Sequence, residues 1–121
     1  MRLVQVALRA DDLDRAADFY TVLLETTPSA RFDDPGLVFF DLDGVRLLLD
    51  RAAPASLLYL QVENLHDTLD RLDGLVEVLS PPHAIFTHDD DALGPAGHEE
   101  WQAFLRDSEG NTVGLVAFPR A

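Results

Sequence analysis

The chain has 121 residues, of which 47% are apolar and 26% are charged, a composition that suits one globular domain. It contains no cysteine, which excludes disulfides, thiolate nucleophiles and cysteine-ligated zinc. All nine basic residues are arginine, so Schiff-base chemistry through a lysine is excluded as well. The net charge of −13 repels nucleic-acid phosphates and anionic lipids and attracts cations. We therefore expect neither a nucleic-acid nor a membrane partner.

The location of the chain is expected to be cytoplasmic. Its longest apolar runs are about five residues, whereas a membrane-spanning helix needs about 18 or more. The first ten residues contain Arg2, Gln5 and Arg9 and no apolar segment of the kind found in secretory signals.

The first half of the chain predicts a strand, a helix and three further strands. Apolar residues alternate from Leu3 to Leu8, which indicates a strand. Asp11-Asp12 offers a cap for a helix that should end near Thr26-Thr27-Pro28, because proline stops helices. The three strands that follow are predicted at Ala30–Phe32, Leu37–Leu42 and Val45–Arg51, with turns at Pro35-Gly36 and Asp43-Gly44.

The second half repeats this order of elements. A strand is predicted at Leu57–Glu63, and Asn64 caps a helix after it. The inward-facing residues of this helix are predicted to be Leu65, Leu69, Leu72 and Leu75. The remaining strands are predicted at Val76–Leu79, at Ala84–Phe86 beyond the break at Pro81-Pro82, and in a hairpin of Trp101–Arg106 with Thr112–Phe118.

The two halves align with each other residue by residue. Leu13, Ala17 and Tyr20 of the first helix match Leu65, Leu69 and Leu72 of the second. The sequence therefore predicts an α+β fold of two tandem βαβββ modules, about 1–52 and 56–121, within a single domain that spans 1–121. Neither module can bury both sides of its sheet alone, so we expect the two to pack together.

Side chains in a strand alternate between its two faces, and here each strand has one uniformly apolar face and one mixed face. The apolar faces should be covered by the helices. The mixed faces hold Gln5, Arg46, Tyr59, Gln61 and Thr112. Such a surface, partly polar and partly apolar, is typical of a ligand pocket. The alternative is an interface between subunits.

Two motifs add a family resemblance. The helix opening Asp-Asp-Leu-Asp-Arg-Ala-x-x-Phe-Tyr (Asp11–Tyr20) and the closing Asp-Ser-Glu-Gly-Asn-x-Val-Gly-Leu (Asp107–Leu115) resemble the vicinal oxygen chelate superfamily. This superfamily comprises glyoxalases, bleomycin resistance proteins and extradiol dioxygenases. The resemblance implies a cup-shaped, curved mixed sheet with helices on its convex side and the ligand on its concave side. It also implies a homodimer.

The resemblance further implies four strand positions where the enzymes of this superfamily carry metal ligands, usually His or Glu. In this chain the four positions hold Gln5, Leu48, Leu57 and Gly114. A single neutral amide does not hold a divalent cation alone. We therefore expect no metal and no other cofactor, although a divalent metal held by other residues is an alternative, and no catalytic residue is assigned.

A loop rich in His and carboxylates precedes the last hairpin. His83, His88 and His98 lie within 18 residues of sequence that also hold five carboxylates. Three readings stay open: a metal or acid–base site, contacts of His83 or His88 with a ligand at the pocket rim, and a solvated loop. The spacing matches no zinc pattern, which disfavours the first.

Three further side chains are candidates for the pocket. Tyr59, on the mixed face, is the best candidate for stacking on a ligand. Arg46 could meet a ligand carboxylate, or pair with Asp50 or Gln61. Trp101, the single tryptophan, is a core or interface residue or else a ligand platform.

The favoured function is metal-independent binding of a small organic molecule, of the resistance or sequestration type. One alternative is a lyase or isomerase of the glyoxalase or methylmalonyl-CoA epimerase kind with a non-standard metal site, and another is a dimeric interaction module without a ligand. The predicted ligand-binding residues are Gln5, Arg46, Leu48, Leu57, Tyr59, Gln61, His83, His88, Trp101 and Gly114.

Overall fold

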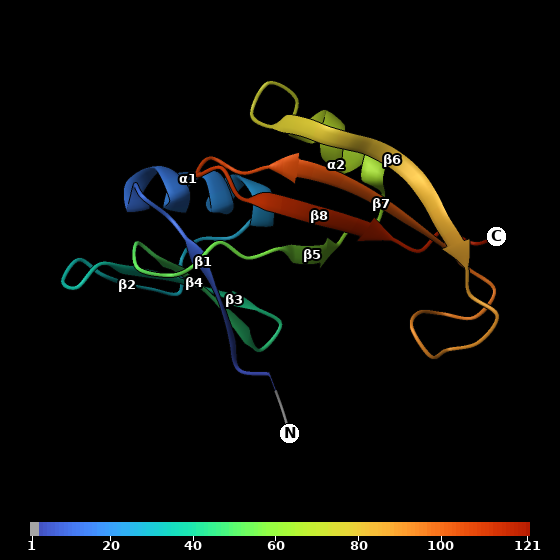
Figure 1. Ribbon diagram of the computed structural model, residues 1–121, viewed down its shortest axis with the longest axis horizontal. Coiled ribbons are helices and arrows are strands. Elements are labelled where there is room, and N and C mark those ends of the chain that lie inside the picture. The colour runs from blue at the N-terminus through green and yellow to red at the C-terminus, as the bar shows by residue number, and fades with distance from the viewer. Residues whose placement is uncertain (1–2) are drawn as a thin grey trace. The chain divides into compact units, whose positions relative to one another are not determined.

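A computed structural model describes residues 3–121, so the first two residues of the predicted first module lie outside the described part. Within that part the order strand–helix–strand–strand–strand occurs twice, and each repeat builds one four-stranded mixed sheet (Figure 1). The predicted α+β fold of two βαβββ modules is therefore confirmed. No helix within residues 3–121 is long and apolar enough to cross a membrane.

The chain divides into two compact units, which are described separately. The first contains the residues up to Ser56 together with Ser108–Asn111, and the second contains Leu57–Asp107 together with Thr112–Ala121. The turn 108–111, which links the last two strands, therefore belongs to the first unit.

The first module forms a sheet in the order β1-β4-β3-β2, with β1 parallel to β4 and the other pairs antiparallel. The β3–β4 hairpin turns at Asp43-Gly44, where both residues have positive φ (51° and 89°), as the predicted tight turn requires. Its elements are β1 (Gln5–Arg9), α1 (Leu13–Leu24), β2 (Ala30–Phe32), β3 (Leu37–Leu42) and β4 (Val45–Asp50).

Helix α1 begins where the sequence predicts and ends earlier. The Asp12 side chain accepts a hydrogen bond from the backbone N–H of Arg15 at 3.0 Å, which confirms the cap. The helix ends at Leu24 rather than near Pro28, because Glu25 adopts the left-handed conformation (φ 55°) and this interrupts the helical hydrogen bonds.

Helix α1 covers one face of the first sheet, where it contacts β3 and β4. Tyr20 is fully buried, as expected for a core residue. The strand residues on this covered face are those of the predicted apolar parity, and they form the core with α1: Leu8, Val38, Phe40, Leu47 and Leu49. The opposite face carries Gln5, Ala7, Phe39, Arg46 and Leu48, which we call the open face of the first sheet.

The second module repeats the topology, with the order β5-β8-β7-β6 and β5 parallel to β8. Strand β6 is one continuous strand, whereas the sequence predicted two segments separated by Pro81-Pro82. Prolines are tolerated there because β6 is an edge strand and its pairing with β7 shifts register around them. The elements are β5 (Leu58–Gln61), α2 (Leu65–Arg71), β6 (Glu77–Thr87), β7 (Glu99–Arg106) and β8 (Thr112–Ala117).

Helix α2 is capped by Asn64, as predicted, and packs on β7 and β8. It is shorter than the leucine pattern suggests. Leu65 and Leu72 are buried, but Leu75 is 57% exposed, so its predicted inward position is wrong. The reason is that the helix ends at Arg71, and the chain turns before Leu75 at Gly74, whose φ is +79°.

Candidate ligand-binding face

The face of the second sheet opposite α2 gathers four of the predicted site residues, and we call it the open face of the second sheet. Directly paired residues of neighbouring strands share a face, so the strand register places the side chains in rows. The first row contains Tyr59, Gly114, Phe104 and Ser80. The second row contains Gln61, Val116, Gln102 and His83.

Tyr59 is the aromatic centre of the first row. Its ring packs edge-on against Phe104, with the centroids 5.8 Å apart and an interplanar angle of 81°. The residue remains 50% exposed. A ring held by a neighbour while half of it faces solvent offers a stacking surface with little conformational freedom to lose.

Gly114 provides the room for these two rings. A Cβ at this position would lie 3.0 Å from Cδ1 of Tyr59 and 3.1 Å from Cε1 of Phe104. The two aromatic rings therefore occupy the space into which a side chain of residue 114 would project. Tyr59 and Gly114, predicted separately as site residues, are direct partners in the β5–β8 pair.

The second row presents hydrogen-bond acceptors. Nδ1 of His83 lies 2.8 Å from the carbonyl oxygen of Pro81, so in the tautomer that donates this bond Nε2 is an acceptor. The amide nitrogen of Gln102 donates to Oε2 of Glu100 at 2.7 Å, which leaves the amide oxygen of Gln102 for a ligand. These acceptors suit a ligand with hydrogen-bond donors, and the Glu100 carboxylate beside the row disfavours an anionic group.

His88 lies beside this row, at the end of β6. Its side chain is 2% exposed, and Nε2 lies 3.0 Å from Oε1 of Glu100. The ring packs between Phe86 (4.4 Å between centroids) and Phe118 (5.7 Å). A Cβ at Gly94 would lie 2.7 Å from the His88 ring, so this glycine lets the loop close over the imidazole. The sequence offered no signal for the pairing of His88 with Glu100.

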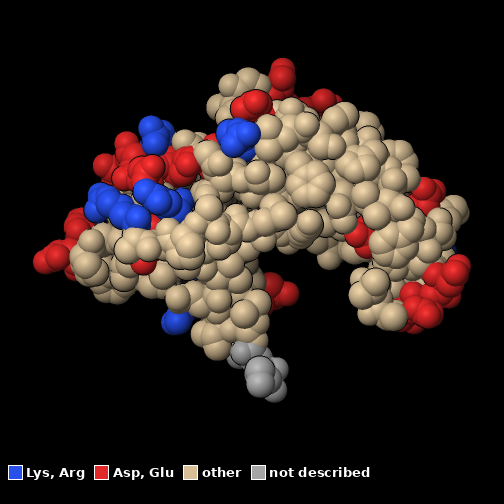
Figure 2. All heavy atoms as spheres, in the orientation of Figure 1, with Lys and Arg blue, Asp and Glu red and all other residues tan. Residues whose placement is uncertain are grey.

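The acidic part of the loop is solvated. Asp89, Asp90 and Asp91 are exposed, and Figure 2 shows acidic side chains gathered on this loop. The side chains of Asp90 and Asp91 accept backbone hydrogen bonds from Ala92 and Ala96, which shapes the loop itself. Among residues 3–121, no three His, Asp or Glu side chains are grouped in a way that could hold a metal ion.

Three predicted residues lie on the open face of the first sheet: Gln5, Arg46 and Leu48. Gln5 and Arg46 are register partners, and the Arg46 guanidinium lies 5.7 Å from the centroid of Phe39. Phe39 was missed, although its parity in β3 places it on this face. Asp50 was considered as a partner of Arg46. Its Oδ1 accepts a hydrogen bond from the backbone N–H of Ala52.

Two predicted residues do not join these rows. Leu57 precedes β5 and is 51% exposed. Trp101 lies on the α2 side of the second sheet, since it shares its parity with the buried Ala103 and Leu105. Trp101 and Tyr59 therefore belong to opposite faces of the same sheet.

The four positions implied for metal ligands do not suit a divalent cation. Gln5 offers one neutral amide oxygen, and Leu48 and Leu57 offer no donor atom. At Gly114 the aromatic rings fill the space of a ligating side chain.

The comparisons with known proteins agree with this architecture. The family model described as Glyoxalase/Bleomycin resistance protein/Dioxygenase superfamily matches residues 2–115. The chain belongs to this superfamily. The resemblance inferred from the two motifs is thereby confirmed. A search of curated protein sequences found no match.

Several solved structures share this fold. A lactoylglutathione lyase from Agrobacterium tumefaciens is 21% identical, with a TM-score of 0.68, over 96% of this chain and 92% of that one. A glyoxalase/bleomycin resistance protein/dioxygenase from Nocardioides is 19% identical, with a TM-score of 0.69, over 98% and 84%. A virulence protein from Salmonella typhimurium is 15% identical, with a TM-score of 0.71, over 98% and 97%.

Proposed function

We propose that this superfamily member binds a small planar organic molecule on the open face of its second sheet, without a metal ion in the site. The observation that carries the proposal is the packing at Gly114. Where a metal-dependent relative would place a ligating side chain, this chain places the rings of Tyr59 and Phe104. The position thus offers an aromatic surface instead of a metal ligand.

The neighbouring groups define the kind of ligand. A ring that stacks on the exposed part of Tyr59 would bring its edge toward the second row, because Gln61 lies two residues further along β5. That row offers the acceptor atoms of His83 and Gln102, and the carboxylate of Glu100 lies next to it. A planar compound with N–H or O–H donors at one edge fits both rows. A binder of such compounds would act by sequestration, as in resistance proteins.

A thermal-shift screen with matched aromatic compounds tests the proposal. Benzamidine, benzamide and benzoate share one ring and differ in the donors and charge at its edge. We expect the increase in melting temperature to be largest with benzamidine, smaller with benzamide and smallest with benzoate. It should persist in excess EDTA and be lost in Tyr59→Ala. Leu57→Ala is the matched control, because it removes an equally exposed apolar side chain outside the rows. Stabilisation that needs an added divalent metal would contradict the proposal.

The enzyme alternative is tested by lyase activity. The hemithioacetal of methylglyoxal and glutathione is the appropriate substrate for a glyoxalase-type reaction. We expect no turnover with or without added zinc, nickel or manganese. Metal-dependent turnover would contradict the proposed binding function. It would support the alternative, a lyase that holds its metal through other residues.

Two further expectations stay predictions, a homodimer and a cytoplasmic location. Light scattering should give about twice the chain mass of 13.4 kDa. The dimer should weaken at low salt, since the charge of −13 makes the subunits repel each other. A monomer at every salt concentration would contradict the first expectation, and cell fractionation tests the second.

A further inference from the structure

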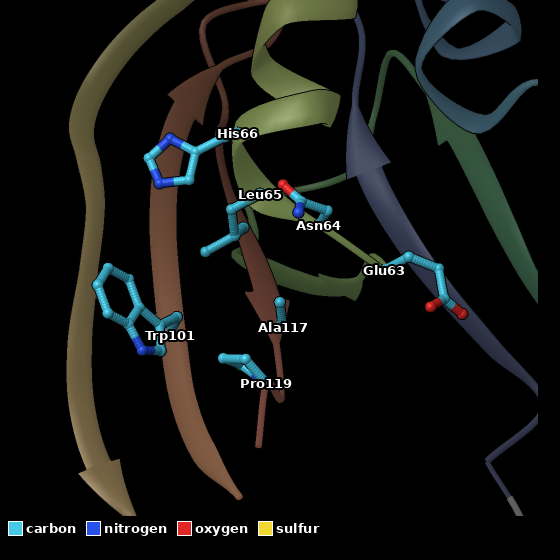
Figure 3. A pocket seen from close by; sticks show the side chains of 7 residues that line it. All are labelled: Glu63, Asn64, Leu65, His66, Trp101, Ala117 and Pro119. Atoms are coloured by element: carbon cyan, nitrogen blue, oxygen red, sulfur yellow. The ribbon is translucent and has the colours of Figure 1, made fainter. Parts of the chain in front are cut away.

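A pocket lies on the α2 side of the second sheet, and the proposed function does not use it. Its walls come from the start of α2 and the two residues before it, and from β7, β8 and the segment that follows β8, all within the second unit (Figure 3). Its lining includes Glu63, Leu65, His66, Trp101, Ala117 and Pro119. Since Tyr59 lies on the other face of the sheet, this pocket is separate from the open face.

The size of the pocket limits its occupant. Its volume is about 210 Å³. Pockets that hold drug-sized ligands have volumes of about 300–1,000 Å³, and a dry cavity of about 150 Å³ accepts benzene. A single ring or one branched alkyl group is therefore the largest apolar part that fits.

The indole of Trp101 is the main recognition element. Its Nε1–H donates to Oε2 of Glu99 at 3.1 Å, which holds the ring in one orientation. A carboxylate that accepts this bond also raises the electron density of the indole and so strengthens the attraction of its face for a cation. In Figure 3 the rings of Trp101 and His66 lie on the same side of the pocket but apart from each other, with Trp101 toward Pro119.

The charges around the pocket favour a cation. Among the residues that line the pocket, Glu63 carries a negative charge and none is an arginine. In Figure 3 the Glu63 carboxylate points away from the indole, so it contributes through the electrostatic potential and not as a direct partner of a group on the ring. A small anion is disfavoured by both Glu63 and Glu99.

The pocket wall formed by Pro119 is held in place. The backbone N–H of Glu99 donates to the carbonyl of Pro119 at 2.8 Å, and the N–H of Ala121 donates to the carbonyl of Gly97 at 3.1 Å. These bonds continue the pairing with β7 beyond the end of β8. The wall therefore exists before any ligand binds, which lowers the entropic cost of binding.

We propose that this pocket binds a small quaternary alkylammonium cation, with its methyl groups against Leu65, Ala117 and Pro119 and its charge over the Trp101 indole. A trimethylammonium group matches the pocket in size, in its apolar surface and in its charge. This site does not depend on the function proposed for the open face.

Trp101 is the chain's single tryptophan, so its fluorescence reports on this pocket directly. Choline is the probe, and 3,3-dimethyl-1-butanol is its neutral analogue, in which carbon replaces the charged nitrogen. At constant ionic strength we expect choline to change the emission saturably, with a dissociation constant on the order of 1–10 mM. The neutral alcohol should bind at least about fivefold more weakly. Equal binding of the two, or no saturable change with choline, would overturn the proposal.

Variants separate the pocket from general effects of charge. Glu99→Gln should weaken choline binding about fivefold and leave the neutral alcohol unaffected. Glu77→Gln is the matched control, because Glu77 on β6 is exposed, pairs with Arg106 of β7 and does not line the pocket. An equal loss in Glu77→Gln would show a response to net charge alone and would overturn the pocket assignment.

Tyr59→Ala separates this site from the open face. We expect Tyr59→Ala to retain the fluorescence response to choline while it loses the thermal stabilisation by benzamide, which is neutral and is therefore not favoured by the charges around the pocket. If Tyr59→Ala abolished the choline response, the cation would bind on the open face and this proposal would be wrong. Loss of the stabilisation by benzamide alone leaves the pocket supported, so the two proposals can fail independently.

Discussion

Arg15 and Glu109 form an ion pair across 94 residues of sequence, with Nε of Arg15 2.6 Å from Oε2 of Glu109. The Glu109 side chain is 1% exposed, while that of Arg15 is 55% exposed. Oε1 of Glu109 also accepts the backbone N–H of Asp12 at 2.8 Å. The turn 108–111 is thereby attached to the start of α1, and Asn111 adds a bond to the carbonyl of Arg9.

This ion pair predicts a loss of stability in acid. Burial raises the pKa of Glu109, but the hydrogen bonds from Arg15, Asp12 and Ser108 outweigh it and hold the pKa below its ordinary value. A carboxyl group with a lowered pKa stabilises the folded state above its unfolded pKa of about 4.3, and this stability is lost as the pH falls through the folded pKa.

Urea unfolding of the wild type and of Glu109→Gln between pH 7 and pH 3 measures this contribution. We expect the variant to be less stable at neutral pH and the difference to shrink below about pH 4. The exposed Glu77→Gln is the control and should differ little from wild type at any pH. If the free energy of unfolding differed between wild type and Glu109→Gln by the same amount at every pH, the lowered pKa assigned to Glu109 would be wrong.

Gly114→Ala should destabilise the second module. The Cβ of an alanine at position 114 would lie 3.0 Å from the Tyr59 ring and 3.1 Å from the Phe104 ring, so one ring must move. We expect a loss of about 1–3 kcal/mol in the free energy of unfolding and weaker binding of benzamidine. Adding Tyr59→Ala removes one of the two rings and should recover part of the stability, which a double-mutant cycle measures. Additive losses would mean that the methyl group does not meet Tyr59.

The two faces of the second sheet should respond differently to truncation. Leu115 is fully buried beneath α2, so Leu115→Ala should cost about 2–5 kcal/mol in the free energy of unfolding. Tyr59→Ala should cost on the order of 1 kcal/mol, because the residue is half exposed and mainly loses its contact with Phe104. Equilibrium denaturation compares the two. A larger loss for Tyr59→Ala would mean that the ligand-binding face had been assigned to the wrong side.

The metal content of the purified protein tests the donor set. Gln5, Leu48, Leu57 and Gly114 together supply one neutral donor side chain, so elemental analysis should find well under one divalent ion per chain. EDTA should leave the melting temperature unchanged. Stoichiometric zinc, nickel, manganese or iron would direct attention to His83, His88 and His98.

Features that depend on a few neighbouring residues could be predicted from the sequence. Asp12 and Asn64 cap their helices and Asp43-Gly44 makes its turn, because a cap or a tight turn involves only the residues beside it. Alternation along the strands also sorted Leu47 from Arg46 and Leu60 from Tyr59, since side chains alternate whatever the neighbouring strand is. These local rules were sufficient to predict two βαβββ modules.

Features that depend on contacts between distant segments were decided by the tertiary structure. Strand β6 runs through Pro81-Pro82 because an edge strand does not need every N–H for pairing. The bonds of Glu109 with Arg15 and of His88 with Glu100, and the packing of Tyr59 and Phe104 over Gly114, depend on register and on which side chains meet. A single sequence carries no local signal for such contacts, because their energy comes from groups that only the complete fold brings together.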